Sequence, residues 1–78
     1  MITHDSKSQL QHLIQAKQQQ PPTYRVIKAE GPDHNRTFTV EVSAGDIVLG
    51  KGTGKSKKSA ETDAARSALK RLPSSFTG

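Results

Sequence analysis

At 78 residues the chain has the length of one small domain, and 31% hydrophobic residues allow only a small core. Twelve Lys and Arg against seven Asp and Glu give a net charge of +5, which predicts a polyanionic partner or surface. No cysteine is present, which excludes disulfides and thiolate metal sites. Apolar runs are too short for a secretion signal or a membrane span, so we expect a cytoplasmic protein without membrane contact.

A first helix is predicted to open near Asp5 or Ser6, and Ser6 with Gln9 fits a capping box. One apolar stripe with helical spacing follows: Leu10, Leu13 and Ile14. The opposite face carries neutral donors and acceptors: Ser8, Gln11, His12 and Gln15. Pro21-Pro22 then stops the helix.

Three strands are predicted next. Residues 23–30 are rich in β-prone side chains, and residues 31–35 are a cluster of turn formers. Phe38, Val40 and Val42 alternate with polar residues, as in a half-buried antiparallel strand. Residues 44–46 form a short hairpin connection, after which a third strand starts at Ile47 and runs into the glycines.

The stretch 52–60 connects this strand to a second helix. Its two glycines predict a tight turn, and Ser56 predicts a helix N-cap. Lys57 and Lys58 then fall in the first turn, where the helix end is already partly positive. Two cations at that end are locally unfavourable unless they meet an anion. This favours the hypothesis that the two lysines contact a phosphate over the alternative that they only face solvent. Four lysines between positions 51 and 58 concentrate the excess charge in this part of the sequence.

The second helix is predicted to run from 57 to 72 and to end at Pro73. Small and apolar residues share one face, which allows a close approach to a sheet: Ala60, Ala64, Ala65, Ala68, Leu69 and Leu72. In the first turn the same sector holds Lys57 and Glu61 instead. We therefore expect the first turn to overhang the sheet and to point into solvent or ligand.

The predicted fold class is α+β, in the order α-β-β-β-α, with both helices packed on one face of a three-stranded antiparallel sheet. Four segments resemble the double-stranded RNA-binding domain in order and spacing: Pro-Thr-Tyr at 22–24, Gly-Pro-Asp-His at 31–34, Phe-Thr-Val-Glu-Val at 38–42 and Gly-x-Gly-x-Ser-Lys-Lys-x-Ala at 52–60. The opening Lys-Ser-Gln-Leu-Gln-His at 7–12 looks most like the version at the C-terminal end of bacterial ribonuclease III. The resemblance covers residues 5–72 and leaves tails at 1–4 and 73–78.

This resemblance implies three regions that contact RNA. The first is the polar helix face with Ser8, Gln11, His12 and Gln15, facing a minor groove. The second is the loop with Pro32, Asp33 and His34, facing a neighbouring minor groove. The third is the helix start with Lys55, Lys57 and Lys58, facing phosphates of the major groove between them. Many members of the family place a further lysine where this chain has Glu61, which matches the ribonuclease-like subset.

Two other hypotheses compete with RNA binding. Residues 50–56 look like a Walker A loop, but the position that needs its first glycine is Leu49. The second hypothesis is a domain of the same fold that mainly binds proteins. Such domains tend to lose the basic residues at the start of the helix, which are present here. Because the seven acids are scattered, we expect no catalysis, metal, cofactor or small-molecule substrate in this chain. We expect a monomeric domain, either free-standing or part of a longer ribonuclease.

Overall fold

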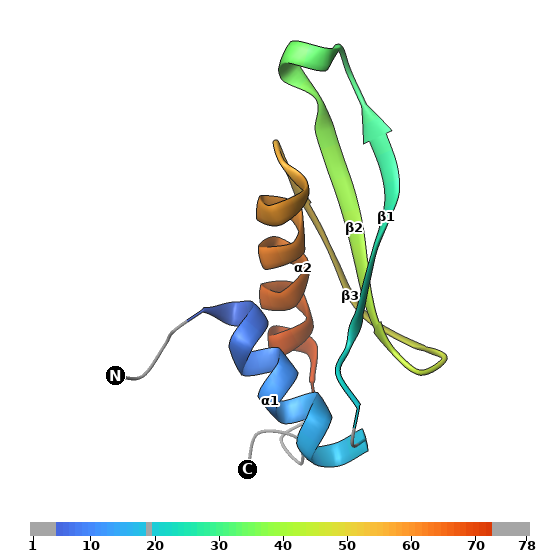
Figure 1. Cartoon of the computed structure of the whole chain (residues 1–78), viewed down its shortest axis with the longest axis vertical. Helices are drawn as coiled ribbons and strands as arrows, with labels where there is room; N and C mark the ends of the chain where they lie inside the picture. Colours follow the sequence, from blue (N-terminus) through green and yellow to red (C-terminus); the bar gives the residue numbers. More distant parts are fainter. Residues whose placement is uncertain (1–4, 19, 73–78) are drawn as a thin grey trace.

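The computed structural model describes residues 5–18 and 20–72 and has the predicted order of elements (Figure 1). They are helix α1 (Ser6–Gln18), strand β1 (Thr23–Glu30), the short 3-10 helix η1 (Asp33–Asn35), strands β2 (Thr37–Ala44) and β3 (Ile47–Gly54), and helix α2 (Lys57–Arg71). The predicted tails at 1–4 and 73–78, and the predicted stop at Pro73, lie outside the described residues.

The three strands form one antiparallel sheet in the order β1-β2-β3. Val40 in the central strand lies opposite Val26 of β1 and Gly52 of β3. The connection between β2 and β3 is a tight hairpin in which Gly45 has a φ of 61°, a conformation that glycine adopts without steric cost. The predicted hairpin is therefore confirmed.

Both helices lie on the same side of the sheet, as predicted (Figure 1). The alternation predicted for β2 is confirmed, because Val40 and Val42 are completely buried while their neighbours are only half-buried. The core consists of small and branched residues from both helices and the central strand: Leu10, Ile14, Val40, Val42, Ala44, Ala60, Ala64, Ala65 and Ala68. Leu10 and Ile14 of α1 thus share one core with the alanines of α2, whereas Leu13 of the predicted stripe is only half-buried and lies outside this core. Helix α2 packs against α1 and against strands β2 and β3.

Gly52 and Gly54 correct one prediction, since they belong to β3 and form no turn. Helix α2 crosses β3 so closely that a Cβ atom on Gly50 would lie 2.7 Å from the backbone nitrogen of Ala68. A Cβ atom on Gly54 would lie 2.7 Å from the nitrogen of Ala60. These glycines provide space for the helix, so the first turn of α2 packs against β3. The expectation that this turn overhangs the sheet is therefore wrong.

The two helices are capped in different ways. Asp5 caps α1, because its carboxylate accepts from the Lys7 backbone N–H at 3.3 Å and its carbonyl accepts from Gln9. The capping box predicted from Ser6 and Gln9 is wrong, since Ser6 is already the first helical residue. Ser56 caps α2 as predicted, and it forms a reciprocal box with Ser59.

Candidate nucleic-acid interface

All ten residues predicted to contact RNA are exposed. Four of them lie on α1, on the side away from the buried Leu10 and Ile14: Ser8, Gln11, His12 and Gln15. The Ser8 hydroxyl donates to the Asp5 carboxylate at 3.3 Å, so it is held near the start of the helix. This face presents hydroxyl, amide and imidazole groups without a formal charge when the histidine is neutral.

The loop between β1 and β2 is ordered by its own side chains. Gly31 enters it with a φ of 96°, and Pro32 directly precedes the short helix η1. Asp33 is ion-paired to Arg36 at 2.8 Å, and the Arg36 guanidinium also donates to the Gly31 carbonyl. Asp33 is therefore a partner of Arg36 that holds the loop together, a contact that the sequence prediction missed although the i, i+3 spacing was a signal. His34 is exposed on this ordered loop.

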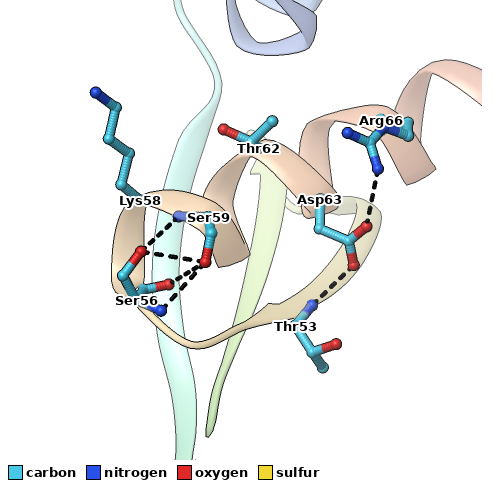
Figure 2. Close-up of a pocket in the computed structure, with 7 residues that line it drawn as sticks. All are labelled: Thr53, Ser56, Lys58, Ser59, Thr62, Asp63 and Arg66. Atoms are coloured by element: carbon cyan, nitrogen blue, oxygen red, sulfur yellow. Dashed lines mark hydrogen bonds and ion pairs between the residues drawn. The ribbon is translucent and has the colours of Figure 1, made fainter.

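The predicted lysines surround the N-terminus of α2. Lys57 and Lys58 occupy its first two positions, and both are exposed. Figure 2 shows the Lys58 side chain extending away from the Ser56 and Ser59 cap. Lys55 precedes the helix, and its ammonium donates to the Thr37 hydroxyl at 3.1 Å. Positive side chains thus gather at a helix end that already favours anions, and no acidic side chain lies in this first turn.

The three regions follow one another along the long axis of the molecule, which measures 42 Å. Figure 1 shows the η1 loop at one end, the N-terminus of α2 next to it and α1 towards the other end. The fourth lysine of the cluster lies elsewhere. Lys51 alternates with Gly50 and Gly52, whose missing side chains would point at α2, so it lies on the opposite face of the sheet.

A shallow polar groove of about 500 Å³ follows the start of α2 along the free edge of β3 (Figure 2). Within it the Asp63 carboxylate accepts from the Thr53 backbone N–H at 2.9 Å and pairs with Arg66 at 3.6 Å. Asp63 thereby covers an edge N–H that would otherwise be free to pair with another strand. We interpret this groove as a structural seam between α2 and β3.

Glu61 also departs from the prediction, because it does not point into solvent or ligand. Its carboxylate accepts from the Lys7 ammonium at 2.5 Å, and only 28% of its side chain is exposed. The sequence held a signal for this pair that the prediction missed. Lys7 precedes Leu10 by three residues and therefore shares the inward-facing stripe of α1.

The structure opposes the nucleotide-binding alternative. The residues that look like a Walker A loop, 50–56, run mostly along β3 in antiparallel pairing with β2 and form no phosphate loop before the helix. Among the described residues, no three His, Asp or Glu side chains gather closely enough to hold a metal ion. None of the helices within residues 5–18 and 20–72 combines the length and apolar character needed to cross a membrane.

Comparisons with known proteins found a family, bacterial relatives and a solved structure that this chain resembles. Residues 6–72 match the family described as double-stranded RNA binding motif. The chain is 53% identical over 73 residues to Ribonuclease 3 of Dehalococcoides mccartyi strain CBDB1, covering 94% of this chain and 31% of that protein. It is 52% identical over 69 residues to Ribonuclease 3 of Enterococcus faecalis, covering 88% of this chain and 30% of that protein.

A solved structure of Dicer from Pichia stipitis is similar in fold and sequence. It gives a TM-score of 0.72 at 34% identity, over 87% of this chain and 33% of that one. The chain spans about a third of the length of the relatives that it matches. Because the family match covers residues 6–72, nearly the whole sequence, the chain belongs to the double-stranded RNA-binding motif family.

Proposed function

We propose that this chain binds double-stranded RNA by shape, through two minor grooves and the phosphates of the major groove between them. The observation that carries this proposal is the alignment of three exposed regions along one axis: the polar face of α1, the η1 loop and the lysines at the start of α2. A module of this kind spans about 16 bp of duplex. The bases need not be read, because A-form RNA hides them in a deep and narrow major groove.

The chemistry of each region suits the groove assigned to it. Neutral donors and acceptors such as Gln11 and Gln15 match the 2′-hydroxyls and base edges of a wide minor groove. His34 would reach the neighbouring minor groove from the loop that Arg36 and Asp33 hold together. A lysine is a flexible point charge that tolerates variation in phosphate position and carries no sequence information.

The functional unit that we propose is residues 5–72. Support comes from its ends, since Asp5 caps α1 and the backbone N–H of Leu72 donates to Ala68 at the end of α2. We further propose that the unit serves a ribonuclease III-like protein whose catalytic domain is supplied by other parts of that protein. The identity to bacterial Ribonuclease 3 supports this assignment.

We also propose that the isolated domain is monomeric and acts in the cytoplasm. Both sheet edges carry features that discourage pairing with a second copy. The register of β1 shifts between Val26 and Lys28, and Asp63 covers part of β3. Sedimentation at several concentrations tests the monomer, because a self-associating domain would sediment faster as its concentration rises.

The proposed function is tested by titrating the chain with RNA and DNA duplexes of the same sequence at matched salt. We expect clear preference for RNA, since B-form DNA lacks both the 2′-hydroxyls and the groove width that the face of α1 would meet. Equal affinity for the two duplexes would contradict binding by shape. Absence of binding to either duplex would favour a domain that mainly binds proteins.

A further inference from the structure

Three side chains from three different elements meet where α1 begins. The Lys7 ammonium of α1 lies 2.5 Å from the Glu61 carboxylate of α2 and 5.0 Å from the centre of the Tyr24 ring of β1. Only 34% of the Lys7 side chain and 28% of the Glu61 side chain are exposed. This ion pair is therefore partly shielded from water, and such pairs are more directional and less weakened by salt than exposed ones.

The pair differs in kind from the other contacts between the two helices. Leu10 and Ile14 of α1 pack into the core with the alanines of α2. Apolar packing of this kind attracts without direction, so alone it defines the relative position of two helices less sharply than a charged hydrogen bond does. The Tyr24 ring closes one side of the pair. Burial, and then the Glu61 and Asp5 charges, raise the pKa of the Tyr24 hydroxyl to about 12.

The pair also lies close to two of the regions assigned to RNA. Ser8 and Gln11 follow Lys7 by one and four residues, within about one helical turn. Lys57 and Lys58 precede Glu61 by four and three residues, again within about one turn. The bridge therefore joins the turn of α1 that would enter a minor groove to the turn of α2 that would face the adjacent phosphates.

We propose that the Lys7–Glu61 bridge, seated on Tyr24, is a positioning device that holds α1 and the start of α2 at the spacing of adjacent grooves in duplex RNA. This inference rests on the proposed function, because the spacing matters only if both regions bind one duplex. A duplex offers its minor groove and its phosphates at fixed separation. A protein that already holds that separation loses less freedom on binding, and its two contacts reinforce each other.

Lys7 and Glu61 carry opposite charges, so replacing each in turn changes the net charge in opposite directions. A positioning role can therefore be distinguished from an effect of net charge on RNA affinity. Lys7→Met lowers the net charge by one, whereas Glu61→Gln raises it by one. Simple attraction to phosphates predicts that Lys7→Met binds RNA more weakly and Glu61→Gln binds more tightly. Positioning predicts that both variants bind more weakly. The double variant should then be about as weak as either single variant, because the interaction is already lost.

The experiment measures affinity for two RNA duplexes, one of about 16 bp that reaches all regions and one of about half that length. It is run with the full 78-residue chain at a temperature where every variant is folded by its amide spectrum. We expect both single variants to lose roughly tenfold in affinity for the long duplex, a small part of the 10²–10⁴ gain that linked contacts can give. Their affinity for the short duplex should fall far less. A role in stability alone lowers the unfolding temperature without this dependence on duplex length.

Lys17→Met is the matched control, because Lys17 is exposed in the last turn of α1 and its replacement changes the charge as Lys7→Met does. Should Lys7→Met fail to fold, Glu61→Gln decides, since it keeps the size of the side chain and removes the negative charge that pairs with Lys7. If the unaltered chain binds RNA and Glu61→Gln binds the long duplex equally or more tightly, the positioning role is overturned while the proposed function stands. If the unaltered chain does not bind duplex RNA, the proposed function fails and the inference with it.

Discussion

Gly52 of β3 lies so close to Ala64 of α2 that no side-chain carbon fits between them: a Cβ atom on Gly52 would overlap the Ala64 backbone nitrogen. The backbone of the helix therefore rests directly on the backbone of the strand. This contact brings the N-terminus of α2, with Lys57 and Lys58, to the edge of the sheet. The glycines that look like part of a binding loop thus act by allowing α2 to pack closely on β3, and this packing positions the lysines.

Gly52→Ala is expected to destabilise the fold by about 3 kcal/mol or more, because rigid backbone must move to admit the methyl group. A loss of that size is a large part of the stability of a small domain. Urea denaturation followed by circular dichroism measures it. Lys51→Ala is the control, since this neighbour is exposed on the opposite face and should change stability by less than about 0.5 kcal/mol. Similar stability of the two variants would contradict the close packing.

Gln11→Ala and His34→Ala should each weaken RNA binding while the fold stays intact, because both side chains are exposed. Lost hydrogen bonds of this kind typically amount to about 0.5–1.5 kcal/mol each. Calorimetric titration with duplex RNA gives the affinity, and amide spectra report the fold. Thr23→Ala, an exposed change outside the three regions, serves as the control. Native spectra with unchanged affinity for both variants would show that the minor-groove assignments are wrong.

Replacing Lys57 and Lys58 together by alanine should make RNA binding less sensitive to salt. Each phosphate contact releases condensed counterions, and by the relation for duplex DNA each lost contact lowers the log–log slope by about 0.9. The double variant should flatten the slope by nearly two and weaken binding to every duplex alike. Fold stability should stay the same or rise slightly, since alanine favours the helix and two cations leave its positive end.

The control for this pair lies at the other end of the same helix. Lys70 and Arg71 are exposed in the last turn of α2, and their replacement by alanine changes the net charge equally. This variant should keep most of the salt dependence. Equal flattening of the slope in both double variants would mean that Lys57 and Lys58 act only through net charge.

Tyr24 should ionise at unusually high pH. Burial, followed by the Glu61 and Asp5 charges, raises the pKa of its hydroxyl from 10.0 to about 12. Folding therefore favours the neutral phenol. The stability that this adds is complete below pH 10 and is lost as the pH rises towards 12. The chain has one tyrosine and no tryptophan, so tyrosinate absorbance during an alkaline titration reports Tyr24 alone. A midpoint at 10.0 would contradict a sheltered ring.

Tyr24→Phe extends this test. Among the described residues, the buried Tyr24 hydroxyl has no hydrogen-bond partner, so its removal should leave stability at neutral pH unchanged or slightly higher. The alkaline loss of stability between pH 10 and 12 should become smaller. Chemical denaturation at neutral and alkaline pH compares the two proteins. An equal alkaline loss in both would assign that loss to other groups.

The sequence by itself determined the class of the fold, the order of its elements and the three exposed regions. The fold class and the order of elements follow from local spacing, whereas the three regions were indicated by the resemblance to a known family. Leu10 and Ile14 mark one face of a helix, the alternation of Val40 and Val42 marks a half-buried strand, and Ser56 marks a helix start. Helical and extended periodicity depend on neighbours a few residues away, so they can be predicted before any tertiary contact is known.

Only the tertiary structure decided what the glycines, Lys51 and Glu61 do. Gly52 is equally compatible with a turn or with a strand beneath a helix, and the approach of Ala64 selects the strand. Lys51 is adjacent in sequence to the other lysines, but the alternation of β3 directs it to the opposite face. Glu61 pairs with Lys7, 54 residues away, and lies where the sequence predicted solvent. Such outcomes depend on which surfaces meet when helices and sheet pack together, and local spacing carries no information about residues so far apart in the chain.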